Sequence, residues 1–242
     1  MEKGDSLIPL RDSARSRSFP VVNLGLILLT GFVFIKELGL SQAGLTRLYA
    51  VYAVNPAKIV WAVGHFASNP TTAARVLGTL VTAIFLHGGW LHLGGNMLYL
   101  WVFGDNVEDR LGHLRYLLLY LTAGVAGFLV HSFLLAPVTV PTIGASGAIA
   151  GVLGAYIVLS PGASVTTLIF LGIFIQVLDV PAFVFLIVWF GMQLLSGVAS
   201  LGQPGTAETV AWWAHVGGFA SGLLLGLLLR RRPRPPRAWD MP

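Results

Sequence analysis

The sequence of 242 residues contains no cysteine and few charged residues. Without cysteine the chain forms no disulfide, carries no thiolate nucleophile and builds no cysteine-based zinc site. Charged residues make up 10% of the chain and hydrophobic residues 55%, and the mean hydropathy is +0.78. A water-soluble domain of this size cannot bury so large an apolar fraction. The composition therefore indicates an integral membrane protein.

Motifs for metal and nucleotide chemistry are missing as well. The chain has no H-E-x-x-H metalloprotease motif and no glycine loop that would cradle a phosphate. Its net charge of +5 comes mostly from the two ends, and no basic stripe is interleaved with aromatic residues. We therefore expect no metal, no cofactor and no nucleic-acid partner, and we attribute the positive charge to contact with anionic membrane lipids.

Apolar segments close to the length of a transmembrane helix fill most of the sequence. We predict an all-α polytopic membrane protein with a large first outer loop at residues 39–85, which contains Pro56 and Pro70 and is too polar and broken to span. Polar tails at 1–20 and 230–242 flank the membrane domain at 21–229. The six predicted spans are 21–38, 86–104, 114–135, 146–160, 181–199 and 210–229.

The basic ends predict the orientation of these spans. Arginines precede the first span, and the sequence "RRRPRPPR" (230–237) follows the last one. The positive-inside rule places both ends in the cytoplasm, which requires an even number of spans. An extra apolar segment at 165–178 is short and bracketed by Pro161 and Pro181, so we expect it to lie at the inner face or dip into it. The composition, rich in alanine, glycine, leucine and arginine, favours a bacterial plasma membrane.

Several polar side chains occur inside the predicted spans, where they are costly unless they face a protein interior or a water-filled cavity. His92 and Asn96 are four residues apart and share one helix face, with His87 just upstream. For this pair alone, a structural hydrogen-bonding cluster between helices and a functional site are equally good explanations.

Ser146 and His215 each begin a stripe of small residues, at similar depths near the outer ends of the fourth and sixth predicted helices. Such stripes let two helices approach closely, and contact between these two faces would bring the hydroxyl to the imidazole. That pair is the minimum for an activated nucleophile. Transporters use the same features for packing and for a polar pathway, so a small transporter remains an alternative. The predicted contact glycines are Gly147, Gly151, Gly218 and Gly222.

Three motifs in order resemble those of the rhomboid intramembrane serine proteases, over nearly all of residues 21–229. They are "FLHGGWLHLGGN", "GASGAIAG", which fits the family's G-x-S-G, and "AHVGGFASG", which fits its A-H-x-x-G-x-x-x-G. The resemblance implies a six-helix core that cleaves transmembrane protein substrates, with Ser146 as nucleophile and His215 as general base and then acid. The residues it implies around the oxyanion are His92 and Asn96, with His87 and Gly144 in support.

The resemblance also implies that the fifth helix, "PAFVFLIVWFGMQLLSG", and the second form a lateral gate for the substrate. Two departures from the family pattern stand out. A Trp-Arg pair in the first loop is replaced by "LGTL" (77–80), and a tyrosine that packs on the catalytic histidine is replaced by Ala150, so other side chains, Phe219 among them, must hold His215. Neither departure removes a catalytic group. A catalytically silent relative that binds transmembrane helices is the second alternative.

Overall fold

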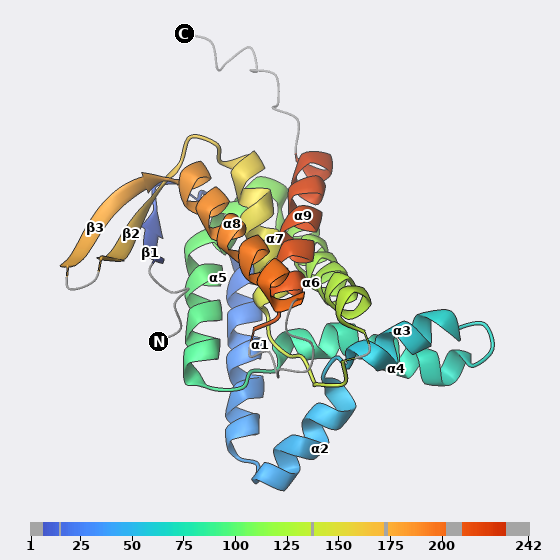
Figure 1. Cartoon of the computed structure of the whole chain (residues 1–242). Helices are drawn as coiled ribbons and strands as arrows, with labels where there is room; N and C mark the ends of the chain where they lie inside the picture. The colour runs from blue at the N-terminus through green and yellow to red at the C-terminus, as the bar shows by residue number, and fades with distance from the viewer. Residues whose placement is uncertain (1–6, 15, 137, 172–173, 202–209, 231–242) are drawn as a thin grey trace.

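The computed structural model describes residues 7–14, 16–136, 138–171, 174–201 and 210–230 (Figure 1). The predicted tail beyond residue 230 lies outside this part of the chain. The helices are α1 (Val21–Leu38), α2 (Gln42–Tyr52), α3 (Pro56–Gly64), α4 (Pro70–Thr82), the 3-10 turn η1 (Ala83–Phe85), α5 (Trp90–Leu111), α6 (His113–Leu135), α7 (Ser146–Leu159), α8 (Ala182–Leu201) and α9 (Trp212–Leu229). The strands are β1 (Leu7–Asp12), β2 (Ser164–Leu171) and β3 (Phe174–Pro181).

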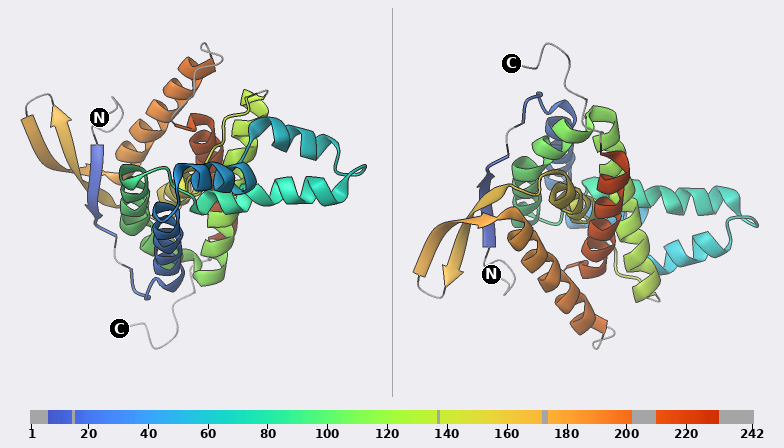
Figure 2. Two further views of the ribbon diagram at one scale, coloured as in Figure 1. Left: turned by 90° about the horizontal axis from the view of Figure 1, so that it is seen from below. Right: turned by 90° about the horizontal axis from the view of Figure 1, so that it is seen from above.

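A bundle of α1, α5, α6, α7, α8 and α9 forms the body of the protein, and α7 lies at its centre (Figure 2). Eleven of the 14 residues of α7 are buried, which identifies this helix as the core. In the described residues α1, α6, α8 and α9 are each long and apolar enough to cross a membrane, and α5 qualifies together with α4 and η1 as a bent pair. The predicted multi-pass helical membrane protein is thus confirmed, whereas the count of six spans stays a prediction.

The second span begins and ends later than the sequence suggested, at Trp90–Leu111 instead of 86–104. Gly89, with φ of 162°, precedes the first turn of α5, and Gly112, with φ of +82°, follows the last. A side chain at Gly112 would strain the backbone, so this glycine suits the sharp turn from α5 into α6.

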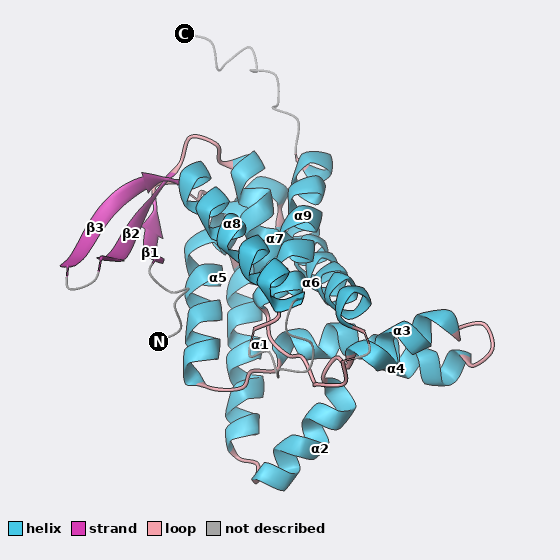
Figure 3. Ribbon diagram, in the orientation of Figure 1, coloured by secondary structure: helices cyan, strands magenta, loops and turns pink. Residues whose placement is uncertain are grey.

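The extra apolar segment at 165–178 is a β-hairpin. Strands β2 and β3 pair antiparallel, and β1 pairs with β2, giving a three-stranded sheet in the order β1-β2-β3. The sheet projects sideways from the bundle where α7 ends and α8 begins (Figure 3). The β-branched residues of this segment favour strands over a short helix. The membrane bundle is therefore all-α, as predicted, and the sheet is an addition outside it.

Asp12 fixes the first strand to the bundle. Its carboxylate accepts hydrogen bonds from the Tyr156 hydroxyl on α7 and, at 2.9 Å, from Asn106 Nδ2 on α5. Burial raises the pKa of Asp12 to about 6. The N-terminal tail, to which the sequence assigned no structure, therefore contributes a strand at the C-terminal end of α7.

The first loop forms the helices α2, α3 and α4, and the α3–α4 pair extends to one side of the bundle (Figure 1). Val54 and Thr142 exchange backbone hydrogen bonds of 3.0 and 2.7 Å, and Asn55 Nδ2 donates to Thr139 O at 2.8 Å. These bonds join the loop to the segment that leads into Ser146. They anchor the loop through residues 54 and 55, away from the position at 77–80 where the family pattern has its Trp-Arg pair.

Candidate active site

Helices α7 and α9 meet backbone to backbone. A Cβ placed on Gly218 would lie 2.0 Å from the carbonyl oxygen of Gly147, and one on Gly222 would lie 1.9 Å from that of Gly151. Neither position has room for a side chain, because the obstacle is main chain and cannot rotate away. The separation of the two helices is therefore set by these glycines.

Ser146 and His215 lie beside this contact, at the same end of the bundle. Ser146 is the first residue of α7, and a Cβ on the next residue, Gly147, would lie 3.3 Å from the carbonyl oxygen of Ala214, the residue before His215. Ser146 is half-buried and His215 is 7% exposed. The close helix contact thus places the serine and the histidine on adjoining segments of the two helices.

The His215 ring has a buried partner on α8. Its Nδ1 lies 2.7 Å from Oε1 of Gln193, which is also 7% exposed. The rings of Trp189 and Trp212 lie 5.9 and 6.1 Å from the imidazole. Phe219, a candidate for holding His215, packs on Trp189, whose ring lies next to the imidazole. Gln193 was not among the predicted site residues, although it is an amide inside an apolar helix, the feature that identified Asn96 as a candidate.

A second polar group comes from the start of α5. Asn96 Nδ2 donates to His87 Nε2 at 2.8 Å, and the rings of His87 and His92 lie 4.8 Å apart. The backbone N–H of His87 donates to Glu37 Oε2 on α1 at 3.1 Å, and Glu37 is only 3% exposed. Glu37 was also missed, and its signal in the sequence is a carboxylate inside the first span. The three predicted residues of this group are brought together.

The loop before Ser146 rests on the same group. Gly144 has φ of +123°, and a Cβ there would lie 2.6 Å from His92 Nε2 and 3.8 Å from Asn96 Nδ2. Its backbone N–H donates to the carbonyl of Ala83 at 2.9 Å. Both the conformation and the space require glycine, so His92 and Asn96 lie directly beneath the segment that leads to the serine.

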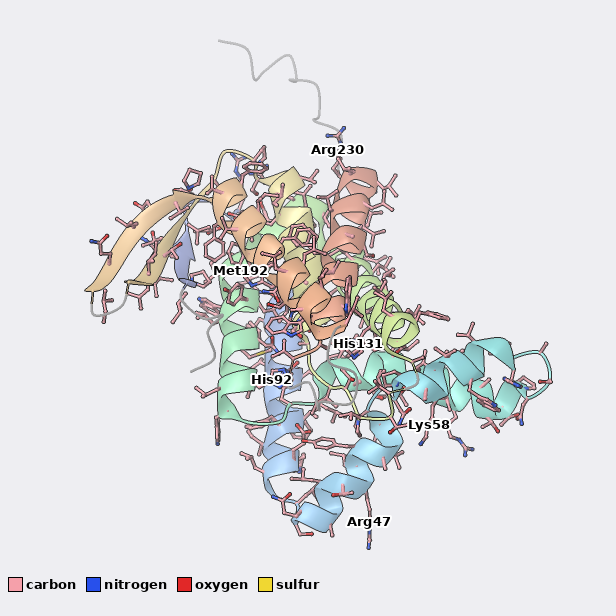
Figure 4. The ribbon with its side chains drawn as sticks, in the orientation of Figure 1. Arg47, Lys58, His92, His131, Met192 and Arg230 are labelled. Atoms are coloured by element: carbon pink, nitrogen blue, oxygen red, sulfur yellow. The ribbon has the colours of Figure 1, made fainter. Side chains whose placement is uncertain are left out.

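The two ring nitrogens of His92 face different neighbours. The Gly88 N–H points at Nδ1 at 3.5 Å, a distance longer than an ordinary hydrogen bond, and Nε2 is the nitrogen next to Gly144. Figure 4 shows His92 and His131 toward the end of the bundle that carries the first-loop helices. Within the described ranges, no group of three or more His, Asp or Glu side chains is placed to hold a metal ion.

Comparison with known proteins bears on this arrangement. The model of the Rhomboid domain matches residues 74–232, which contain every residue discussed at the site except Glu37. This chain belongs to the rhomboid family. The predicted resemblance is confirmed, and with it the assignment to a membrane-embedded family that contains serine proteases.

Similar proteins come from bacteria and eukaryotes. RHOMBOID-like protein 4 of Arabidopsis thaliana is 36% identical over 154 residues, which are 64% of this chain and 34% of that protein. Rhomboid protease GluP of Bacillus subtilis (strain 168) is 49% identical over 83 residues, 34% of this chain and 16% of that protein. Rhomboid protein 1, mitochondrial, of Saccharomyces cerevisiae is 31% identical over 157 residues, 61% and 40% of the two chains. The matched region spans less than two thirds of these relatives.

Proposed function

We propose that this protein is an intramembrane serine endopeptidase that cleaves transmembrane segments of membrane-protein substrates with a dyad of Ser146 and His215. The observation that carries the proposal is the glycine contact of α7 and α9, which lies beside both residues at one end of the bundle. Membership of the rhomboid family supports it, since relatives named rhomboid proteases share the matched region.

The proposed reaction needs one base and one nucleophile. With its Nδ1 proton directed at Gln193, a neutral His215 has a free lone pair on Nε2. This nitrogen takes the proton of the Ser146 hydroxyl as Oγ bonds to the carbonyl carbon of the scissile peptide. The imidazolium then returns the proton to the leaving amine as the C–N bond breaks. Water hydrolyses the acyl-enzyme by the same route and regenerates the serine.

The oxyanion formed in this step needs hydrogen-bond donors. His92 Nε2–H and the Asn96 amide lie beside Gly144, two residues before the nucleophile, and the Ser146 backbone N–H belongs to the uncapped first turn of α7. His87 holds one side of the Asn96 amide through its Nε2. We assign His92, Asn96 and the Ser146 N–H to the oxyanion, and His87 and Gly144 to their support.

The proposed entrance for a substrate helix lies between α5 and α8. Their contact is aromatic. The centroid of the Tyr99 ring lies 6.5 Å from those of Phe185 and Trp189, and the centroid of the Phe103 ring lies 6.1 Å from that of Phe185. Of the most apolar 18 residues of α8, 28% are buried, against 44% in α6. A helix held by few buried side chains separates from its neighbours at lower cost than one held by many.

Labelling with a fluorophosphonate, which reacts with activated serines, separates this proposal from its two alternatives. We expect the purified protein to be labelled and to cleave a transmembrane substrate in liposomes. Ser146→Ala and His215→Ala should each lower cleavage by on the order of 10⁴-fold or more, because the two groups act as a unit. Unlabelled, inactive and folded wild-type protein would favour a silent helix-binding relative or a small transporter.

We further propose that the protein lies in a bacterial plasma membrane with both termini in the cytoplasm. Arg230 lies at one end of the bundle, and Arg47 and Lys58 of the first loop lie toward the other (Figure 4). Arg115, at the start of α6, donates to the carbonyl of Leu229 at 3.3 Å and so belongs to the same end as Arg230. Reporter fusions should find both termini inside, whereas an external C-terminus would contradict the six-span arrangement.

A further inference from the structure

The gate helix α8 carries the hydrogen-bond partner of the proposed catalytic base. Gln193 faces the bundle and is 7% exposed, whereas the next two residues, Leu194 and Leu195, are 39% and 73% exposed. Its Oε1 lies 2.7 Å from His215 Nδ1, and both groups are removed from solvent. A buried amide in an apolar span is costly unless it is paired, and this contact provides its pairing.

The contact determines which nitrogen of the imidazole is basic. An amide oxygen only accepts, so the proton of neutral His215 resides on Nδ1 and the lone pair on Nε2. When Nε2 takes the serine proton, the ring becomes a cation and its bond to Oε1 becomes charge-assisted and stronger. The Gln193 oxygen therefore stabilises the protonated base more than the neutral one, which is the property that lowers a barrier.

We propose that Gln193 is a positioning residue for His215 and that, because it belongs to α8, the base is competent only while α8 is packed against α9. The inference rests on the proposed Ser146–His215 dyad. When α8 moves outward to admit a substrate helix, Oε1 leaves Nδ1, and the imidazole loses the partner that fixes its tautomer. Acylation then waits for α8 to return, so bond cleavage is coupled to closure of the gate.

Two substitutions separate the acceptor from packing. Gln193→Met keeps the length of the side chain and removes the acceptor, while Gln193→Glu keeps an acceptor at the same place. Met192→Leu, one residue away on the same helix, is the matched control. We measure kcat and KM for a transmembrane substrate in liposomes, the rate of Ser146 labelling by a fluorophosphonate, and thermal stability.

We expect Gln193→Met to lower kcat and the labelling rate together by about 10- to 100-fold, the value of one hydrogen bond to a charged group, with little change in KM. Gln193→Glu should recover most of this loss, and Met192→Leu should match the wild type. Wild-type labelling of Gln193→Met would overturn the inference. So would a Gln193→Glu protein as slow as Gln193→Met at equal thermal stability, because packing and not the acceptor would then be lost.

Coupling to the gate is tested by holding α8 closed. A Cβ on Gly197, one turn beyond Gln193, would lie 3.5 Å from Trp212 Cβ on α9, a distance that suits a disulfide. Because the Trp212 ring lies 6.1 Å from the His215 imidazole, the comparison is made between the two redox forms of one Gly197→Cys/Trp212→Cys protein. The oxidised form should be labelled at least as fast as the reduced form, and adding Gln193→Met should slow both. Slower labelling on oxidation would overturn the coupling. Persistent cleavage by Ser146→Ala would instead overturn the dyad itself, which keeps the two failures distinct.

Discussion

Helix α9 packs against α6, α7 and α8, and it meets the last two in opposite ways. Toward α7 it presents Gly218 and Gly222, whose main chain touches the main chain of α7. Toward α8 it presents Phe219, whose ring lies 4.5 Å from that of Phe190 and 6.2 Å from that of Trp189. The first contact is main chain against main chain and cannot adjust. The second is made by side-chain rings, of which Phe219 is buried and Trp189 and Phe190 are half-buried, and such rings can part and pack again.

The two contacts have different roles in the proposed site. The fixed α7–α9 contact holds the segments that carry Ser146 and His215. In the proposed mechanism their relation stays the same while a substrate binds and leaves, and the yielding α8 contact, which supplies the Gln193 acceptor, governs access. A protease that admits a whole helix, as proposed, needs both properties, and α9 combines them on the faces it turns to α7 and α8.

The largest expected effect comes from breaking the fixed contact. Gly222→Ala places a methyl group 1.9 Å from the carbonyl oxygen of Gly151, so the two helices must separate. Overpacking of this kind costs about 1–3 kcal/mol or more, and the shift falls on the helices that carry Ser146 and His215. We expect lower thermal stability and loss of nearly all cleavage, measured by thermal unfolding in detergent and by cleavage in liposomes.

The matched control is Gly31→Ala in α1, where an added Cβ meets nothing within 4 Å. The same substitution there should leave activity unchanged and raise stability by up to about 1 kcal/mol, since alanine favours a helix more than glycine does. Equal behaviour of the two variants would mean that the glycine contact does not determine the geometry of the site.

The sequence predicts the fixed contact well and the yielding contact poorly. Gly218 and Gly222 follow His215 at helical spacing, and glycine has few uses in a helix other than close approach, so the pattern carries its own geometry. The partner of His215 on α8 has no such pattern. Gln193 belongs to an otherwise apolar helix, and the rotation of α8 about its axis, which decides where Gln193 points, depends on packing with several other helices.

The three-stranded sheet and the pairing of Val54 with Thr142, which anchors the first loop, could not be predicted from the sequence for a related reason. Both depend on pairing between segments far apart in the chain, such as Asp12 with Val165 and Val54 with Thr142. Hydropathy shows that a segment is apolar but contains no information about which backbone it pairs with. The prediction of an inner-face segment at 165–178 therefore carried no expectation of strands.

The second prediction converts the yielding contact into a fixed one. In the Gly197→Cys/Trp212→Cys protein, oxidation should lower cleavage of a transmembrane substrate by about tenfold or more, because the state that admits a helix is no longer populated. The chain has no cysteine of its own, so no other disulfide forms within it. Reduction with dithiothreitol should restore cleavage, and the oxidant should not change the rate of cleavage by either single-cysteine variant. Undiminished cleavage by the oxidised form would show that substrates enter away from the C-terminal half of α8.

The smallest expected effect comes from loosening the yielding contact further. Phe190→Val removes the ring that stacks on Phe219, whereas Trp189 is unsuitable for this test because its ring also lies beside His215. A weaker closed state is open more often, so cleavage of a transmembrane substrate should rise by about two- to tenfold while thermal stability falls. A small soluble ester, which needs no lateral entry, should gain less.

Phe183→Val is the matched control for this change. It removes the same kind of ring from the same helix, at a position where 54% of the residue's surface is exposed. It should leave both activities near the wild-type values.

Because Gln193 must return to His215 before each acylation, the gain from Phe190→Val is bounded. Once α8 is open most of the time, the time spent with a competent base becomes limiting and the rate of cleavage falls again. A double variant that weakens the α8 contact twice, Phe190→Val with Phe185→Val, should therefore cleave more slowly than Phe190→Val alone while remaining folded. A further rise in the double variant would show that access alone limits cleavage and that closure contributes nothing to the chemistry.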